Sequence, residues 1–135
     1  MSTSHDLRAA RARFAYDEAA GWKKDVRKPT TQRVKGLPVQ MRTQGLMQTL
    51  AVLMADDREY VRHLAEVTGK WLLFEAPYRA LQEAGSAQPH WGYARRLLES
   101  CMKASRLEYA WAQLEAIQLL DQIKIYADAL SKEGG

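Results

Sequence analysis

The stretch SRLEYAWAQLEAIQLLDQIKIYADALSK, residues 105–132, decides the fold of this chain. It begins with Ser105-Arg106-Leu107-Glu108, which has the spacing of a capping box: the serine caps the helix backbone and the glutamate reaches back to the serine. Apolar residues then recur three and four positions apart, a period typical of an amphipathic helix. The stretch therefore predicts one long helix from about Arg106 to Lys132.

This predicted helix has apolar residues on two nearly opposite sides. One stripe consists of Leu107, Trp111 and Leu114, and the other of Ala116, Leu119, Ile123, Ala127 and Leu130. A helix that is apolar on two sides is buried on two sides. It therefore either runs through the centre of a helical bundle or turns its second stripe toward a neighbouring subunit.

The segments upstream of this helix also have helical spacing of their apolar residues. The expected elements are a helix over residues 4–26 capped by Ser4 or Asp6, a short helical turn up to Lys35, a helix over residues 38–55, a helix from Asp56 or Asp57 up to Pro77, a short helical piece from Pro77 to about Gly85, a loop over residues 85–89, and a helix around residues 91–101. No segment shows strand alternation. The sequence thus predicts an all-α fold, a single-domain helical bundle of about five to six helices over residues 1–135.

Two residues are expected to interrupt these helices. Pro29 predicts a break over residues 27–31, because the residue before a proline disfavours the helical region. Gly45 lies inside the helix expected over residues 38–55 and costs about 1 kcal/mol there relative to alanine. The glycine therefore suggests close packing or a local bend at that point.

Size and composition are those of one ordinary globular domain. A chain of 135 residues with 47% hydrophobic and 27% charged residues can build one core without disulfides or a metal. The lone Cys101 makes no intramolecular bridge, which points to a reducing compartment, with the cytoplasm as the expected location. The N-terminal residues lack an apolar signal segment, and the longest apolar runs are only a few residues. Neither secretion nor a membrane span is expected.

Basic residues are concentrated in one part of the sequence. Between Ala20 and Leu50 there is one acid, Asp25, and there are seven basic residues: Lys23, Lys24, Arg27, Lys28, Arg33, Lys35 and Arg42. Such a lopsided field attracts polyanions, with RNA, DNA and anionic lipid as candidates. The competing interpretation is an ordinary basic patch that binds nothing, since cations at the end of the first helix also complement the helix dipole.

Residue patterns for catalysis are not found in the sequence. It contains no G-x-S-x-G elbow, no phosphate-binding glycine loop and no dinucleotide fingerprint, and Cys101 falls on an apolar helix stripe. Glu59, His63 and Glu66 share one helix face, but no H-E-x-x-H pattern supports a metal site. We expect no enzyme activity, no cofactor and no metal.

Two tryptophans lie next to basic residues, and aromatic rings in such places can stack on nucleic-acid bases. They are Trp22 and Trp91, and each also falls on the apolar stripe of its expected helix. Core packing is therefore the favoured interpretation, because large aromatic side chains dominate small cores.

One segment resembles a known family. The run VKGLPVQMRTQGLMQTLAVL, residues 34–53, is similar to the signature of the small subunit of the type III-B CRISPR effector, the Cmr complex. In that family a basic N-terminal helix precedes a leucine-proline step, a basic-polar-polar-glycine-leucine segment and an apolar helix. Tyr109, Glu115 and the Leu119-Leu120 pair resemble the family's closing helix. The sequence departs from the pattern over residues 121–124, where Asp-Gln-Ile-Lys replaces an expected tryptophan-leucine-basic-basic run.

The resemblance implies a fold, a function and partners. Such subunits are helical bundles without enzymatic activity that stack in a few copies along the guide-RNA complex and line the groove that holds the target RNA. The implied partners are guide RNA, target RNA, other effector subunits and head-to-tail copies of the same chain, with no membrane.

The leading hypothesis is therefore a binding and scaffolding subunit. Lys35 and Arg42 are its expected phosphate contacts and Gln44 a polar contact. The expected electrostatic rim consists of Lys23, Lys24, Arg27, Lys28 and Arg33. The alternatives are a helical protein-interaction adaptor whose basic face binds an acidic partner, and a small metal-dependent enzyme around His63. Steep salt dependence of RNA binding separates the first hypothesis from the second, because phosphate contacts release counterions.

Overall fold

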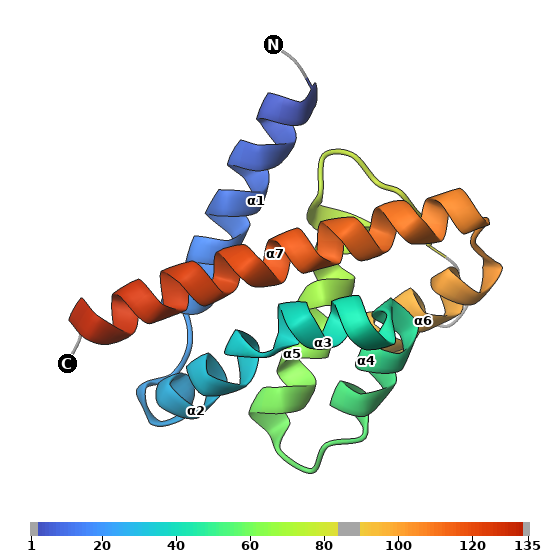
Figure 1. Ribbon diagram of the computed structural model, residues 1–135. Helices are drawn as coiled ribbons and strands as arrows, with labels where there is room; N and C mark the ends of the chain where they lie inside the picture. Colours follow the sequence, from blue (N-terminus) through green and yellow to red (C-terminus); the bar gives the residue numbers. More distant parts are fainter. Residues whose placement is uncertain (1–2, 84–89, 134–135) are drawn as a thin grey trace.

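The computed structural model describes residues 3–83 and 90–133 and contains only helices and their connections in these ranges (Figure 1). The elements are α1 (Thr3–Ala20), α2 (Lys24–Lys35), α3 (Leu37–Gln44), α4 (Leu46–Met54), α5 (Glu59–Lys70), the π-helix η1 (Trp71–Glu75), α6 (Tyr93–Lys103) and α7 (Arg106–Glu133). The all-α prediction is confirmed. Over the described ranges there are seven α-helices, slightly more than the five to six expected.

The longest helix, α7, organises the others. It runs across the whole molecule, with α1 on one side and α2 and α3 on the other (Figure 1). Its capping box is confirmed: the Ser105 backbone N–H donates to Glu108 Oε1 at 2.7 Å, and the Glu108 N–H donates to Ser105 Oγ at 3.1 Å. These bonds satisfy backbone donors that the first turn of a helix otherwise leaves unpaired.

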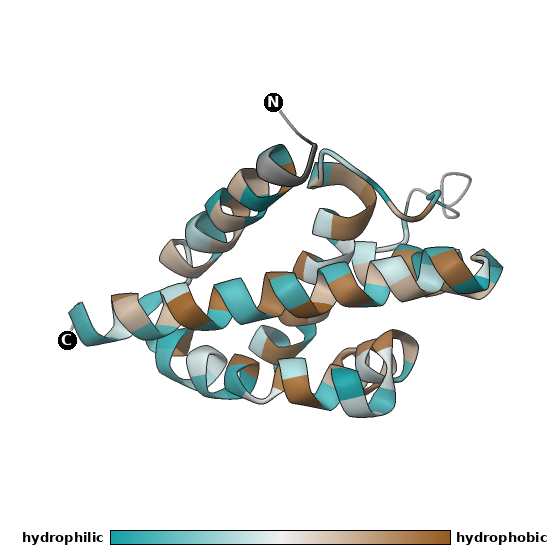
Figure 2. Cartoon of the chain, turned by 45° about the horizontal axis from the view of Figure 1, so that its top comes forward, coloured by the Kyte–Doolittle hydropathy of each residue, from teal (hydrophilic) through white to brown (hydrophobic). Residues whose placement is uncertain are grey.

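The two apolar stripes of α7 differ in their exposure to solvent, which could not be predicted from the sequence. The second stripe packs in the core, where Leu119 and Ile123 are fully buried, so α7 runs through the bundle. The first stripe is exposed, at 69% for Leu107, 54% for Trp111 and 49% for Leu114. The expectation that the second stripe could meet a neighbouring subunit is wrong, because α1 to α5 of the same chain cover that side. Apolar and polar residues accordingly alternate along α7 in Figure 2.

The helix expected over residues 38–55 is divided at Gly45 into α3 and α4. Gly45 has φ 88° and ψ 165°, a conformation that only glycine adopts readily. Side chains of α7 satisfy the first backbone donors of α4: Leu46 N–H donates to Gln113 Oε1 at 2.9 Å, and Met47 N–H donates to Tyr109 Oη at 3.0 Å. The expected bend at Gly45 is confirmed, and α7 fixes it.

The helix expected over residues 4–26 ends earlier, at Ala20, and the break expected at Pro29 is wrong. The chain turns at Gly21 and Trp22, and α2 then continues through Pro29 to Lys35. Thr30 and Thr31 lie after the proline and donate their hydroxyls to the carbonyls of Val26 and Arg27, at 2.5 and 2.7 Å. The turn falls at Gly21 because Trp22 inserts into the core, where it is 7% exposed.

The segment after α5 also differs from expectation. Helix α5 continues directly into η1, where Ala76 N–H donates to the Trp71 carbonyl at 2.9 Å, and the chain then leaves helical geometry. Residues 77–83 form no helix, so the short helical piece expected from Pro77 is wrong over that range. Its expected end near Gly85 and the loop over residues 85–89 lie outside the described residues.

A nearly buried ion pair joins α1 to α7. The Arg11 guanidinium donates to both carboxylate oxygens of Glu115, at 2.7 and 2.6 Å, and Trp71 Nε1 donates to Glu115 Oε2 at 2.8 Å. The two charged side chains are only 9% and 12% exposed. Glu115 therefore connects three elements that are far apart in the sequence.

Candidate nucleic-acid interface

A basic groove lies between α2 and the C-terminal part of α7. Its volume is about 630 Å³, and its lining residues are Lys24, Arg27, Lys28, Thr31, Gln32, Lys35, Asp128 and Ser131. Lys24, Lys28 and Lys35 share one side of α2 because residues four and seven apart lie on the same helix face. We call this hollow the α2–α7 groove. The fold thus brings four of the eight predicted site residues together around a single acid.

Two ion pairs extend the groove along α7. Lys35 Nζ lies 3.5 Å from Asp128 Oδ1, and the Arg42 guanidinium lies 3.2 Å from Asp121 Oδ2. The α2–α3 run is antiparallel to α7, so a step of seven residues on one side matches a step of seven on the other. The predicted phosphate contacts Lys35 and Arg42 therefore lie in one line beside α7.

Two lysines of α7 itself add to this line. Lys124 Nζ lies 3.6 Å from Asp121 Oδ1, and Lys132 Nζ lies 3.4 Å from Asp128 Oδ2. Interaction with Lys132, and to a smaller extent with Lys35, lowers the pKa of Asp128 below its ordinary value. Neither lysine was among the site residues predicted from the sequence. Their spacing of three and four residues after an aspartate, typical of ion pairs on a helix surface, was the available signal.

The basic face comprises the α2–α7 groove together with Arg42, Asp121, Lys124 and Lys132. Among these residues, seven cations surround two carboxylates, those of Asp121 and Asp128. Arg27 is held in the groove by a bond from its guanidinium to the Trp22 carbonyl at 3.2 Å. The face therefore keeps an excess of positive charge after its ion pairs form.

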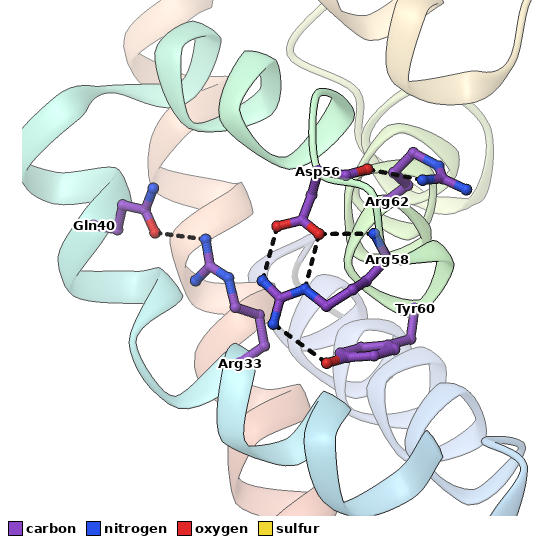
Figure 3. A network of polar contacts seen from close by, with 6 residues as sticks. All are labelled: Arg33, Gln40, Asp56, Arg58, Tyr60 and Arg62. Carbon is purple, nitrogen blue, oxygen red and sulfur yellow. Dashed lines mark hydrogen bonds and ion pairs between the residues drawn. The ribbon is translucent and has the colours of Figure 1, made fainter. Parts of the chain in front are cut away.

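The other predicted site residues lie elsewhere. Arg33 projects from a different side of α2 and donates to Gln40 Oε1 at 3.0 Å, as Figure 3 shows, and Gln40 donates in turn to Gln44 Oε1 at 3.2 Å. Lys23 lines a separate hollow beside Trp22, Tyr60 and His63. The fold does not bring Arg33, Gln44 or Lys23 into the α2–α7 groove.

A second cluster of arginines occurs at the turn between α4 and α5 (Figure 3). Asp56 accepts three bonds from the backbone and guanidinium of Arg58, at 2.8 to 2.9 Å, and its carbonyl accepts a bond from Arg62 at 2.8 Å. The side-chain bonds from Arg58 are the main reason that the pKa of Asp56 falls below its ordinary range. These arginines are engaged in holding the turn before α5, so we assign them a structural role.

The metal candidate residues have other partners. His63 Nε2 lies 2.7 Å from Glu18 Oε2, and the Glu66 carboxylate accepts the backbone N–H groups of Tyr93 and Ala94, at 2.8 and 3.1 Å. Glu66 therefore caps the start of α6. In the described ranges, no group of three or more His, Cys, Asp or Glu residues is arranged to hold a metal ion.

The Glu18–His63 pair makes stability depend on pH. The bond to Glu18 raises the pKa of His63 above 6.5. Burial alone would raise the pKa of Glu18, but bonds from His63 and Trp22 outweigh it and hold that pKa below 4.5. The His63 contribution is thus lost as pH rises through its raised pKa, and the Glu18 contribution is lost as pH falls through its lowered pKa.

We expect His63→Ala to lower the free energy of unfolding by about 0.5 kcal/mol near pH 5.5 and by less near pH 8.5, because the pair is partly exposed. Urea unfolding at both pH values measures the difference. The same substitution in a Glu18→Gln background is the control, where the pH dependence of the effect should be much smaller because the largest cause of the raised His63 pKa is removed. An equal effect of His63→Ala at the two pH values would contradict the prediction.

The two tryptophans and the cysteine discussed in the sequence analysis are partly or fully buried in the fold. Trp22 packs in the core, as expected, whereas Trp91 is half-buried with the Arg95 guanidinium 4.2 Å from its ring centroid. Cys101 is 4% exposed, and burial raises the pKa of its thiol to about 12. A thiol with so high a pKa is protonated at neutral pH and is a poor nucleophile. In the described ranges, none of the helices has the length and apolar character needed to cross a membrane.

A family model described as CRISPR-associated protein (Cas_Cmr5) matches residues 7–130. No curated protein and no solved structure matches the chain. The matched range contains all of α2 to α6 and most of α1 and α7, and thus nearly every residue of the basic face.

Proposed function

Since this chain belongs to the Cas_Cmr5 family, and is thus a subunit of the type III-B CRISPR effector, the Cmr complex, we propose that it binds RNA there along its basic face. The observation that carries the proposal is the alignment of Lys35 and Arg42 with the lysines of the α2–α7 groove. Phosphate groups are the dominant contacts of proteins that bind nucleic acid without reading sequence. The RNA partners proposed are the guide RNA and the target RNA.

We also propose that the subunit is non-catalytic and acts in the cytoplasm. The side chains best suited to chemistry are engaged in the fold. His63 pairs with Glu18, Glu66 caps α6, and the thiol of Cys101 is buried. Cleavage would then belong to other subunits, and this chain would supply positive surface and spacing.

The exposed stripe of α7 supports contact with neighbouring subunits, including head-to-tail copies of the same chain. Leu107, Trp111 and Leu114 follow one another at helical spacing, and each is about half exposed or more. Trp111 and Leu114 line a hollow of about 220 Å³ together with Tyr78, which is 58% exposed. Neighbouring exposed apolar side chains of this kind are characteristic of protein–protein interaction sites, whereas single scattered ones are ordinary on monomers.

We expect Lys35→Ala/Arg42→Ala to weaken binding of single-stranded RNA without changing the helical fold. Each lost phosphate contact flattens the slope of log affinity against log salt by about 0.7, so the loss of two contacts flattens it by up to about 1.4. Fluorescence anisotropy with a labelled RNA of mixed sequence, at several salt concentrations, measures the slope. The effect should be the same for unrelated RNA sequences, because the basic face offers no base-reading motif.

The matched control removes two cations from the far end of the molecule. Arg95→Ala/Arg106→Ala changes the net charge equally but acts at α6 and the start of α7, and it should leave the slope nearly unchanged. If Lys35→Ala/Arg42→Ala also leaves the slope unchanged, then Lys35 and Arg42 serve only their ion pairs with Asp128 and Asp121, and this surface is not an RNA site. The adaptor alternative predicts that wild-type protein shows no salt-dependent binding of RNA at all.

A further inference from the structure

Asp121 and Asp128 are acids at the centre of a basic face. Each carboxylate has one cation on each of its two oxygens. For Asp121 these are Arg42 at 3.2 Å and Lys124 at 3.6 Å. For Asp128 they are Lys35 at 3.5 Å and Lys132 at 3.4 Å. In each case one cation comes from α7 itself and the other comes from α2 or α3.

The two aspartates lie on the same side of α7. They are seven residues apart, so their Cα atoms are about 10 Å apart along the helix axis, at 1.5 Å per residue. That distance is close to the Debye length of about 8 Å at physiological salt, so both carboxylates act on a ligand bound beside this part of α7. A singly charged oxygen pair held between two cations has the electrostatic character of a backbone phosphate.

These ion pairs are exposed enough to be exchanged. The side chains of Lys35 and Arg42 are 43% and 54% exposed, and that of Lys132 is 79% exposed. Ion pairs at such positions stabilise a fold by about 0–1 kcal/mol. A cation can therefore leave its carboxylate for a phosphate at little cost in stability, whereas the uncovered carboxylate then repels the same phosphate.

We propose that Asp121 and Asp128 occupy, in the free protein, the positions that RNA phosphates take in the complex, and that they compete with RNA for Lys35 and Arg42. The inference rests on the proposed function and extends it. The two acids lower the affinity of the isolated subunit for RNA and hold its cations in line along α7. A continuous strand with many phosphates can displace both carboxylates, whereas a mononucleotide offers too few charges to do so.

Asp121→Asn/Asp128→Asn tests the proposal, because asparagine keeps the size of the side chain and removes its charge. Lys35 and Arg42 can then contact phosphate without competition, so the magnitude of the salt slope for single-stranded RNA should rise by the part of about 1.4 that the carboxylates withhold in wild type. The gain in affinity over wild type should then be larger at 50 mM than at 200 mM salt, by at most about sevenfold. The same variant in the Lys35→Ala/Arg42→Ala background should lose most of this gain.

The matched control is Asp57→Asn/Glu75→Gln, which makes the same change in net charge at exposed positions before α5 and at the end of η1. It should leave the slope close to the wild-type value. Circular dichroism checks that each variant is folded, and the two single variants replace the double variant if it unfolds.

The outcomes separate the two proposals. Wild-type binding with an unchanged slope in Asp121→Asn/Asp128→Asn overturns the competition and leaves RNA binding intact. A flatter slope in this variant also overturns it, since the carboxylates would then be positioning the cations for phosphate. Wild-type protein without any salt-dependent RNA binding overturns the proposed function, and the competition with it.

Discussion

Replacing Glu115 with leucine is expected to lower the free energy of unfolding by about 3–5 kcal/mol, the cost of leaving a buried charge without its partner. The partner is Arg11, whose side chain is only 9% exposed and donates two bonds to Glu115. The substitution also removes the acceptor of Trp71 Nε1, at a place where η1 meets α7. Denaturation by guanidinium chloride, followed by circular dichroism, measures the loss.

Two further variants identify its cause. Arg11→Met/Glu115→Leu removes both charges and should recover most of the lost stability, because a buried ion pair can often be replaced by apolar residues of similar volume. Glu115→Gln keeps an acceptor for Trp71 but lacks the charge, and it should lie between wild type and Glu115→Leu. If the double variant is as unstable as Glu115→Leu, the loss comes from packing rather than from the unpaired arginine.

Replacing Gly45 with alanine is expected to cost about 1–3 kcal/mol, because its φ of 88° and ψ of 165° are nearly closed to other residues. An added Cβ would make only ordinary contacts, 3.4 Å from Tyr109 Oη and 3.5 Å from Gln113 Oε1, so the cost comes from the backbone conformation. Urea denaturation measures the cost. The RNA salt slope of the folded fraction should change as well, since Arg42 lies three residues before the break.

Gly36 provides the matched control for Gly45. It also lies between two helices, but its φ is −89° and a Cβ would meet no atom within 4 Å. Gly36→Ala should therefore change stability by less than about 1 kcal/mol, and the sign can be favourable because alanine restricts the unfolded chain. Equal destabilisation by Gly36→Ala and Gly45→Ala would show that the conformation of Gly45 has no special importance.

Residues 34–53, which resemble the family signature, include residues that define the start and end of helices in this chain. Its leucine-proline step begins α3, and its glycine makes the break before α4. The resemblance also singled out Tyr109, whose hydroxyl caps α4, and Glu115, which pairs with Arg11. Residue identity alone could not give these roles, because each depends on a segment more than 60 residues away in the sequence.

The residues that depart from the family pattern, 121–124, also have contacts that can be identified only in the structure. Asp121 contacts Arg42 across 79 residues of sequence, and Lys124 contacts Asp121 from the next turn of α7. In the sequence, Arg42 was an expected phosphate contact and Asp121 only a mismatch. In the structure the two residues form an ion pair at 3.2 Å, and the proposed competition is based on this contact.

Periodicity and capping residues predicted the all-α fold and the long helix α7, but they did not predict α2, because the break expected at Pro29 does not occur. Capping residues and a period of 3.6 act within a few positions, so the capping box at Ser105 and the apolar stripe through Leu119 and Ile123 could be predicted. Three features depend on packing between distant segments: which stripe of α7 is exposed, where the chain turns near Trp22, and which acids pair with Lys35 and Arg42. Periodicity acts over a few residues and identifies the apolar side of a helix, but it does not identify the segment that covers that side. Burial and ion pairing depend on segments far apart in the sequence, which only packing brings together.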